Sequence, residues 1–486
     1  MSSTDPRPLS NWLAVVLVVG TSAAILVLEI LAGRLLAPYV GVSLDTYTGI
    51  IGTVLAGIAI GAWVGGIAAD RVDPRALIPV LLVLGGALAI ATIPTVRGLG
   101  SAGASTGLGG ILLLTAVGFL PSATVLSAVP PAVVKLQLRS LDATGATVGR
   151  LSAYGTAGAI VATFLTGFVL VAVAAVTTLI VTVGVLLVLA GLLMWAAGSR
   201  RLRRATAAPV GGMSAFAGVA LAGATLLGSP CDSQTEYYCV TILDDDRGGR
   251  TLVLDDLRHS YVRDDDPTHL EFWYTARFGD AIDRLAPSGP LDVVHVGGGA
   301  MSVPAWLQAT RPESRQVVFE IDDELIALVV EEFDRDIGAD SGITVVPGDA
   351  RLSLAQRPDG SADVVVGDAF GSRAVPWHLA TTEFVADVRR VLRPGGVYVL
   401  NVIDGPGQDF LAAEAATIRQ SFDHVTVVLG PSAADGGLGN SVIVASDRPI
   451  SGLDPDGGLV VDDLETFIAG AMTLTDDHAP VDQLLK

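Results

Sequence analysis

The sequence is poor in the residues on which most metal and phosphate sites depend. Among 486 residues there are two lysines, Lys135 and Lys486, two cysteines and six scattered histidines. No glycine loop ends in a phosphate-binding lysine, no Ser/His/Asp arrangement is present, and no group of residues has the spacing of metal ligands. The sequence therefore gives no reason to expect a metal ion or a catalytic triad.

Basic residues are also scarce, and their distribution divides the chain. Residues 1–230 contain 12 Lys and Arg against 6 Asp and Glu, whereas residues 231–486 contain 18 against 44, so the net charges are +6 and −26. Such an acidic second half would repel phosphates, and we expect no nucleic-acid partner. The chain is 51% hydrophobic with a mean hydropathy of +0.57, which is too apolar for a wholly soluble protein of this length.

Long apolar runs explain this hydropathy, and seven of them are long enough to span a membrane. They lie near residues 11–33, 46–69, 75–96, 108–134, 148–173, 176–198 and 208–228. Prolines in the fourth run allow either one broken helix or two short ones. We expect residues 1–230 to form a transmembrane helical domain of a multi-pass protein, in contact with the lipid bilayer of the cell membrane. Gly57, Gly61 and Gly65, spaced four apart, predict a face on which another helix packs closely.

Basic residues between the runs predict which side of the membrane each loop occupies. The loops after the second, fourth and sixth runs are basic, which places them and the N-terminus in the cytoplasm. These loops contain Arg71, Arg75, Lys135, Arg139, Arg150, Arg200, Arg201, Arg203 and Arg204. Seven spans then put the acidic half outside, and six or eight spans would reverse its side.

The two cysteines follow the last apolar run directly. Cys231 and Cys239 are eight residues apart, which suits a disulfide in an oxidising compartment. The alternative is a pair of free thiols in a cytoplasmic domain.

The acidic half alternates between apolar strands and helices. A hairpin of 237–243 and 250–254 and a helix over 268–285 form an extension, residues 231–288. Residues 289–486 then predict an α/β doubly wound domain, in which a parallel sheet is covered by helices on both faces. Its strands lie near 291–296, 316–320, 343–346, 362–367, 396–402, 423–429 and 440–446. Ligands of such sheets bind above the carboxyl ends of the strands.

A glycine turn marks the first of these ends. Gly297, Gly298 and Gly299 follow an apolar strand and precede a helix that we expect to start near Ser302. Glycines allow a sharp turn and the close approach of a ligand, and the free N–H groups of the helix face that ligand. The third glycine of the dinucleotide pattern is missing, which disfavours NAD. The alternative is a turn without any ligand.

Three carboxylates follow the next three strands: Glu320, Asp349 and Asp368. Because the strands are expected to be parallel, these acids should converge over the glycine turn. They can bind ribose hydroxyls and an adenine amino group, and one of them can take a proton from an amine. The pattern therefore predicts a nucleoside site next to a general base.

Several motifs resemble those of the spermidine synthase family, whose domain has the class I S-adenosylmethionine-dependent (Rossmann-like) fold. These are LVLDD at 252–256, DDPTHLEF at 265–272, the run 364–402 and TDDHAPVDQLL at 475–485. The whole chain resembles the bacterial membrane-fused spermidine synthase-like proteins, which join a transporter-like helical half to this domain. The resemblance implies that Glu320 binds ribose, Asp349 binds adenine and Asp368 is the base.

The chain departs from this family on the amine side of the site. Ala300 replaces the aspartate of the glycine turn, and the second acid of the fourth-strand motif is absent from Asp368-Ala369-Phe370-Gly371-Ser372. The family's glutamine falls near His259 or Ser260, and its tyrosine at His269. Asp265, His269 and Glu271 are the candidates for holding a cationic amine, and the alternative is a solvated acidic loop.

We expect the first of the following three functions, and the other two are its alternatives. The first is a polyamine aminopropyltransferase that uses decarboxylated S-adenosylmethionine as co-substrate and a small polyamine as acceptor. The second is an S-adenosylmethionine-dependent methyltransferase. The third is a non-catalytic membrane transport or sensor protein whose second domain binds a ligand. A homodimer is compatible with all three.

Overall fold

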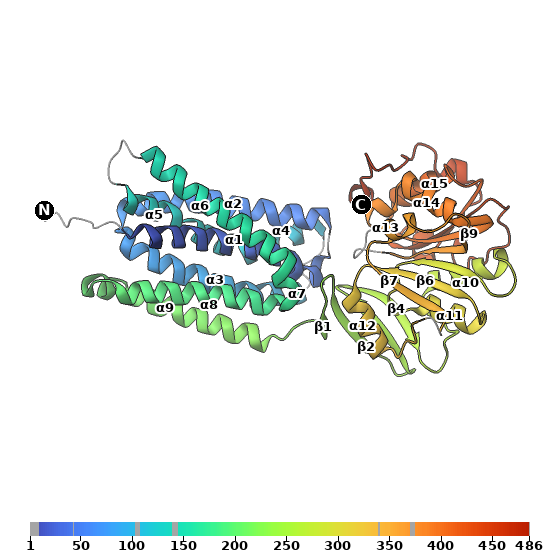
Figure 1. Ribbon diagram of the computed structural model, residues 1–486, viewed down its shortest axis with the longest axis horizontal. Helices are drawn as coiled ribbons and strands as arrows, with labels where there is room; N and C mark the ends of the chain where they lie inside the picture. Colours follow the sequence, from blue (N-terminus) through green and yellow to red (C-terminus); the bar gives the residue numbers. More distant parts are fainter. Residues whose placement is uncertain are drawn as a thin grey trace. The chain divides into compact units, whose positions relative to one another are not determined.

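The computed structural model describes residues 9–41, 43–102, 107–138, 144–338, 341–369 and 375–485. The chain forms two compact units, Met1–Cys231 and Asp232–Lys486, shown in Figure 1. Arg139, Phe370, Gly371, Ser372 and Lys486, which the sequence analysis used, lie outside the described residues.

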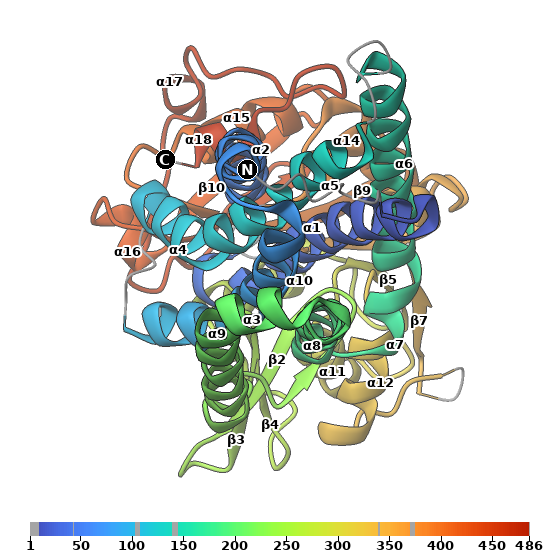
Figure 2. The same ribbon diagram turned by 90° about the vertical axis from the view of Figure 1, so that its left-hand side faces the viewer.

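The first unit consists of helices that lie side by side (Figures 1 and 2). Their bounds are α1 Asn11–Val40, α2 Leu44–Arg71, α3 Pro74–Ser101, α4 Gly107–Ser127, α5 Val129–Gln137, α6 Thr144–Leu165, η2 Thr166–Leu170, α7 Val171–Val173, α8 Val176–Ala197 and α9 Arg200–Leu226. The described part of the chain contains seven helical stretches long and apolar enough to cross a membrane. In this count α4 and α5 form one stretch, and α6 and η2 form another. The number agrees with the seven apolar runs of the sequence, and the fourth run is a broken helix, as its prolines allowed.

Small residues set the contact between α2 and α4. A Cβ on Gly61 would lie 2.0 Å from the carbonyl oxygen of Thr124 in α4, and one on Gly65 would lie 2.5 Å from the Cα of Ala128, which joins α4 to α5. The backbones of the two helices are therefore as close as glycine allows. Elsewhere in this unit α3 packs against α8 and α9, and α1 packs against α6.

The second unit is built around an eight-stranded sheet in the order β12-β10-β11-β9-β8-β5-β6-β7. The strands are β5 Asp292–Val296, β6 Arg315–Glu320, β7 Ile343–Pro347, β8 Ala362–Gly367, β9 Leu392–Asp404, β10 His424–Leu429, β11 Gly439–Ser446 and β12 Leu459–Val460. Strands β5 to β9 are parallel, while β11 runs antiparallel between β9 and β10. The sheet is therefore mixed, and its order reverses direction at β5 and β8, as in a doubly wound fold.

Helices cover both faces of this sheet, which explains why its strands are continuously apolar. The bounds are α10 Trp273–Leu285, α11 Ser302–Thr310, α12 Asp323–Glu332, α13 Ala350–Ala355, α14 Thr382–Val391, α15 Asp409–Arg419, and the short α16 Pro431–Ala434, α17 Leu464–Phe467 and α18 Val481–Leu484. Alternate residues of one strand serve different cores: Val293 packs with α10 and α11, whereas Val294 packs with α13, α14 and α15. This arrangement is a Rossmann-like fold of the class I methyltransferase type.

A second, four-stranded sheet precedes the large one, with strands β1 Ser233–Gln234, β2 Cys239–Asp244, β3 Gly249–Leu254 and β4 Leu257–Arg263. The predicted hairpin is confirmed as β2 and β3, and both cysteines are disulfide-bonded. Strand β4 was not predicted, because the turn before it, Asp255-Asp256, lacks the glycine that usually marks a tight hairpin. Asp255 itself takes the positive φ, 55°, that glycine would supply. The helix predicted from residue 268 begins only at Trp273, since the Asp266 carboxylate accepts from the amide of Thr268 and holds a turn there.

Candidate active site

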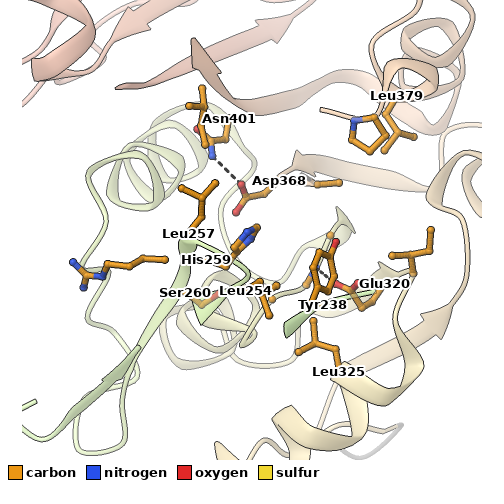
Figure 3. Close-up of a pocket in the computed structure, with 18 of the residues that line it drawn as sticks. Tyr238, Leu254, Leu257, His259, Ser260, Glu320, Leu325, Asp368, Leu379 and Asn401 are labelled. Carbon is orange, nitrogen blue, oxygen red and sulfur yellow. Dashed lines mark hydrogen bonds between the residues drawn. The ribbon is translucent and has the colours of Figure 1, made fainter. Parts of the chain in front are cut away.

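A cavity of about 750 Å³ lies over the carboxyl ends of β5, β6, β7 and β8. Its floor contains the glycine turn and the three predicted carboxylates, so the structure brings Gly297, Gly298, Gly299, Glu320, Asp349 and Asp368 to one cavity. The strands β3 and β4 and residues 271–274 supply the opposite wall. Figure 3 shows Asp368, Glu320 and the β4 residue His259 around this space. The volume is in the range of small-molecule sites.

The glycine turn is in close contact with its surroundings. Gly297 and Gly299 have positive φ values of 92° and 49°, and a Cβ on Gly297 would lie 2.3 Å from the carbonyl oxygen of Asp368. The hydroxyl of Ser260 accepts a hydrogen bond from the amide of Ala300 at 3.0 Å. The turn is therefore tied to β4 on one side and to the end of β8 on the other.

Glu320 ends β6 beside this turn. Its carboxylate accepts hydrogen bonds from the amides of Gly298, at 3.0 Å, and of Asp322, at 3.3 Å. Burial raises the pKa of this carboxyl, and these amide hydrogen bonds oppose the shift. Burial also raises the pKa of Tyr238, with a further contribution from the charge of Glu320, so this tyrosine keeps its proton.

Asp349 follows β7 and caps the helix α13. One carboxylate oxygen accepts from the amide of Arg351 at 2.8 Å, and the other lies 3.1 Å from the Nε2 atom of His378. His378 belongs to a segment, Pro376 to Leu379, that also lines the cavity. Asp349 is thus fixed by its cap and by an imidazole at the far end of the site from Asp368.

Asp368 follows β8 and holds two hydrogen bonds at its carboxylate. Tyr274 donates its hydroxyl to Oδ2 at 3.1 Å. Asn401 donates its side-chain NH₂ to Oδ1 at 3.0 Å, as Figure 3 shows. Burial raises the pKa of Asp368 to about 6, although both hydrogen bonds lower it. A carboxyl with this pKa is ionised near neutral pH and basic enough to accept a proton.

Two of the three residues proposed to hold an amine lie away from the cavity. Asp265 is exposed and paired with Arg263 at 2.7 Å, and neither it nor His269 lines the cavity. Glu271 lines the wall, but its carboxylate already accepts from Arg247 and His269, each at 2.8 Å. Ala300 is fully buried, so the position of the family's aspartate faces the protein core. The acidic loop is therefore largely neutralised by its own cations.

Sequence reasoning missed three polar residues of the site: Tyr238, Tyr274 and Asn401. The resemblance placed a tyrosine at His269, whereas the tyrosine beside Asp368 is Tyr274. Tyr274 lies five residues after His269 and three after Glu271, so a shifted alignment of the family's tyrosine would have indicated it. Asn401 interrupts the apolar part of β9, residues 397–403, which is a signal for a functional contact. Nothing in the local sequence distinguishes Tyr238.

No group of three or more His, Cys, Asp or Glu side chains that could hold a metal ion occurs within the described ranges. The polar groups that line the cavity include carboxylates, tyrosine hydroxyls, two imidazoles, one guanidinium and two asparagine amides.

The fold is that of a class I methyltransferase-like domain, and its cavity contains a buried carboxylate. Comparison with known proteins shows spermidine synthase-like homology in the C-terminal part. A stretch of 115 residues is 33% identical to a probable polyamine aminopropyl transferase of Bifidobacterium longum, covering 23% of this chain and 25% of that protein. A stretch of 135 residues is 30% identical to the polyamine aminopropyltransferase of Vibrio vulnificus, covering 27% and 44%. The chain thus spans a quarter and less than half of these two relatives.

Among solved structures, that of a probable spermidine synthase from Corynebacterium glutamicum is similar at 25% identity. The similarity covers 51% of this chain and 97% of that one, with a TM-score of 0.47. No family model matches the chain.

Proposed function

We propose that the second unit is an aminopropyltransferase of the spermidine synthase type. It would transfer the aminopropyl group of decarboxylated S-adenosylmethionine to a small amine. The observation that carries the proposal is Asp368, a carboxylate with a raised pKa that lines the same cavity as the glycine turn and Glu320. The partial similarity to two aminopropyltransferases supports it.

In the proposed reaction the chain binds and orients the two substrates and takes a proton from the acceptor amine. Glu320 and Asp349 would hold the ribose and adenine of the co-substrate over β6 and β7, with its sulfonium above the glycine turn. The acceptor amine would lose a proton to Asp368, and its lone pair would attack the carbon beside the sulfonium. A C–N bond forms, the C–S bond breaks and its electrons go to sulfur, which releases methylthioadenosine. Positioning supplies much of the rate, because the sulfonium is already a good leaving group.

The test is turnover by the purified full chain in detergent. Putrescine and decarboxylated S-adenosylmethionine should give spermidine and methylthioadenosine in equal amounts, measured by mass spectrometry. Absence of product from folded protein that binds methylthioadenosine would refute the proposal for this acceptor.

Methyl transfer is a second candidate, and Ala300 is the observation that favours it. A decarboxylated co-substrate ends in an ammonium group that needs an anion, and the buried Ala300 supplies none. Calorimetry decides between the two. Tighter binding of intact than of decarboxylated S-adenosylmethionine favours methyl transfer, and the reverse order favours aminopropyl transfer.

The first unit would hold this enzyme in the cell membrane as a multi-pass anchor. Large apolar side chains are exposed along its helices, among them Phe164 and Phe168, and lipid would cover them. If the seven stretches all span, the basic loops place the second unit outside. A reporter fused after Lys486 tests this. Reporter activity inside the cell favours an enzyme supplied with cytosolic cofactor, and activity outside favours ligand sensing in an oxidising compartment, which suits the disulfide-bonded cysteines.

A further inference from the structure

A chain of two asparagine side chains leads from β11 to Asp368. Asn440 donates its NH₂ group to the Oδ1 atom of Asn401 at 3.0 Å, and Asn401 donates its own NH₂ group to Asp368 at 3.0 Å. Both asparagines line the cavity. Asn401 is only 2% exposed, so water does not compete for its hydrogen bonds, whereas Asn440 is half-buried.

The orientation of the Asn401 amide must be fixed by its hydrogen bonds, because the two ends of an asparagine amide have nearly the same shape. If the Asn401 amide turned over, its oxygen would face the Asp368 carboxylate, and the two would repel unless Asp368 took up a proton. Asn440 prevents this reversal, since its NH₂ group needs an acceptor and finds the Asn401 oxygen. We propose that Asn440 is a positioning residue that fixes the Asn401 amide and thereby keeps Asp368 in the carboxylate form that can act as a base.

The other titratable groups around Asp368 carry no charge close enough to set its pKa, which leaves its hydrogen bonds and its burial to do so. A small polar pocket contains Asp368 and five other titratable side chains: His259, Tyr261, Glu271, Tyr274 and His295. Burial lowers the pKa of both His259 and His295 to about 4, so these imidazoles are neutral near pH 7. Glu271 is held by Arg247 and His269, and the Arg258 guanidinium stacks on Phe272 at 5.3 Å. Glu320 lies two strands away over β6 and Asp349 three strands away over β7, so burial, Tyr274 and Asn401 set the pKa of Asp368.

The test is Asn440→Asp. At neutral pH the new carboxylate attracts the NH₂ group of Asn401 and repels its oxygen, so the Asn401 amide should turn over and present its oxygen to Asp368. Asp368 then loses the hydrogen bond that its carboxylate accepts from the Asn401 NH₂ group. It gains a bond to the Asn401 oxygen that it can make only when protonated. The pKa of Asp368 should rise by about 1 to 2 units. Asn440→Leu removes the donor without adding an acceptor and should raise this pKa by about half as much or less.

Labelling with a water-soluble carbodiimide and a glycine ester measures this pKa without turnover, because the carbodiimide reacts with the protonated carboxyl. Mass spectrometry of the full chain after trypsin yields the peptide of residues 352–373, which contains Asp359, Asp363 and Asp368. Asp359 pairs with Arg390 and Asp363 with Arg393, so their labelling serves as an internal control and should not change.

The expected result is a midpoint of Asp368 labelling near pH 6 in the wild type and a higher midpoint in Asn440→Asp. Equal midpoints in the wild type and both variants would overturn the inference. The meaning of this inference for catalysis rests on the proposed function, but the inference and the proposed function can fail separately. A labelling shift in a protein without turnover would leave the inference intact and remove the proposed function, whereas turnover with unchanged midpoints would do the opposite.

Discussion

Asp368→Asn is expected to lower kcat for transfer by about 10²- to 10⁴-fold, which is the usual contribution of a positioned general base. The asparagine cannot accept the proton of the acceptor amine. One end of its amide would also face a donor, either Tyr274 or Asn401, where the carboxylate now accepts two hydrogen bonds. The rate of the variant would then depend only on how the site positions the two substrates.

The binding of the nucleoside separates this effect from unfolding. Glu320, Asp349 and the glycine turn lie over other strands, so the Kd for methylthioadenosine should change by less than about threefold in Asp368→Asn, well under 1 kcal/mol. A large loss of binding together with kcat would contradict the assignment of Asp368 as a base. Asp265→Asn is the matched control, because it makes the same chemical change at an exposed residue outside the cavity and should leave kcat unchanged.

The pH dependence gives an independent check on the same residue. Burial raises the pKa of Asp368 to about 6, and the base is active only when ionised, so kcat/KM of the wild type should fall tenfold per unit as the pH drops below about 6. A wild-type profile that stays flat from pH 7 to pH 5 would show that no group of this pKa acts as the base.

The parts of the site that the sequence predicted are those whose position follows from the sheet alone. Glu320, Asp349 and Asp368 each come directly after an apolar strand, and parallel strands end at one edge, so their convergence needs no knowledge of side-chain packing. The same reasoning located the glycine turn and the start of α11 at Ser302.

The parts that it missed depend on contacts between distant segments. Tyr274, in the first turn of α10, contacts Asp368 at the end of β8, 94 residues away in the sequence. The sequence left the acidic loop open as either a cation-binding or a solvated surface. In the structure Arg263 pairs with its near neighbour Asp265, and Arg247, 24 residues away, pairs with Glu271. The orientation of Asn401 depends on Asn440, which lies 39 residues away.

Glu414→Met is expected to stabilise the second unit by about 2 to 4 kcal/mol at pH 7. Glu414 lies on α15 with no exposed surface, and neither of its carboxylate oxygens has a hydrogen-bond partner among the described residues. It is surrounded by the apolar core that contains Phe410, Leu411 and Ile418. Methionine has a similar length and removes the buried polar atoms, so the core keeps its packing and loses the cost of desolvation.

Part of this gain should depend on pH. Burial raises the pKa of Glu414 well above its usual value of 4.5, so the folded state binds a proton that the unfolded state releases. Stability is then unaffected below pH 4.5 and falls as the pH rises above it. The loss is about 1.4 kcal/mol for each unit until the pKa of the folded state is reached. Glu414→Gln isolates this contribution, because glutamine keeps the buried polar atoms but does not titrate.

Thermal unfolding of the full chain in detergent at pH 4.5 and pH 7 tests both variants. Glu414→Gln should match the Tm of the wild type at pH 4.5 and exceed it at pH 7, whereas Glu414→Met should exceed it at both. A gain of 3 kcal/mol corresponds to about 6 to 12 °C for a unit of this size. If Glu414→Gln shifts Tm equally at the two pH values, the buried carboxyl does not titrate with folding. A lower Tm for both variants at pH 7 would mean that the carboxylate is paired in solution and that its burial is a source of stability.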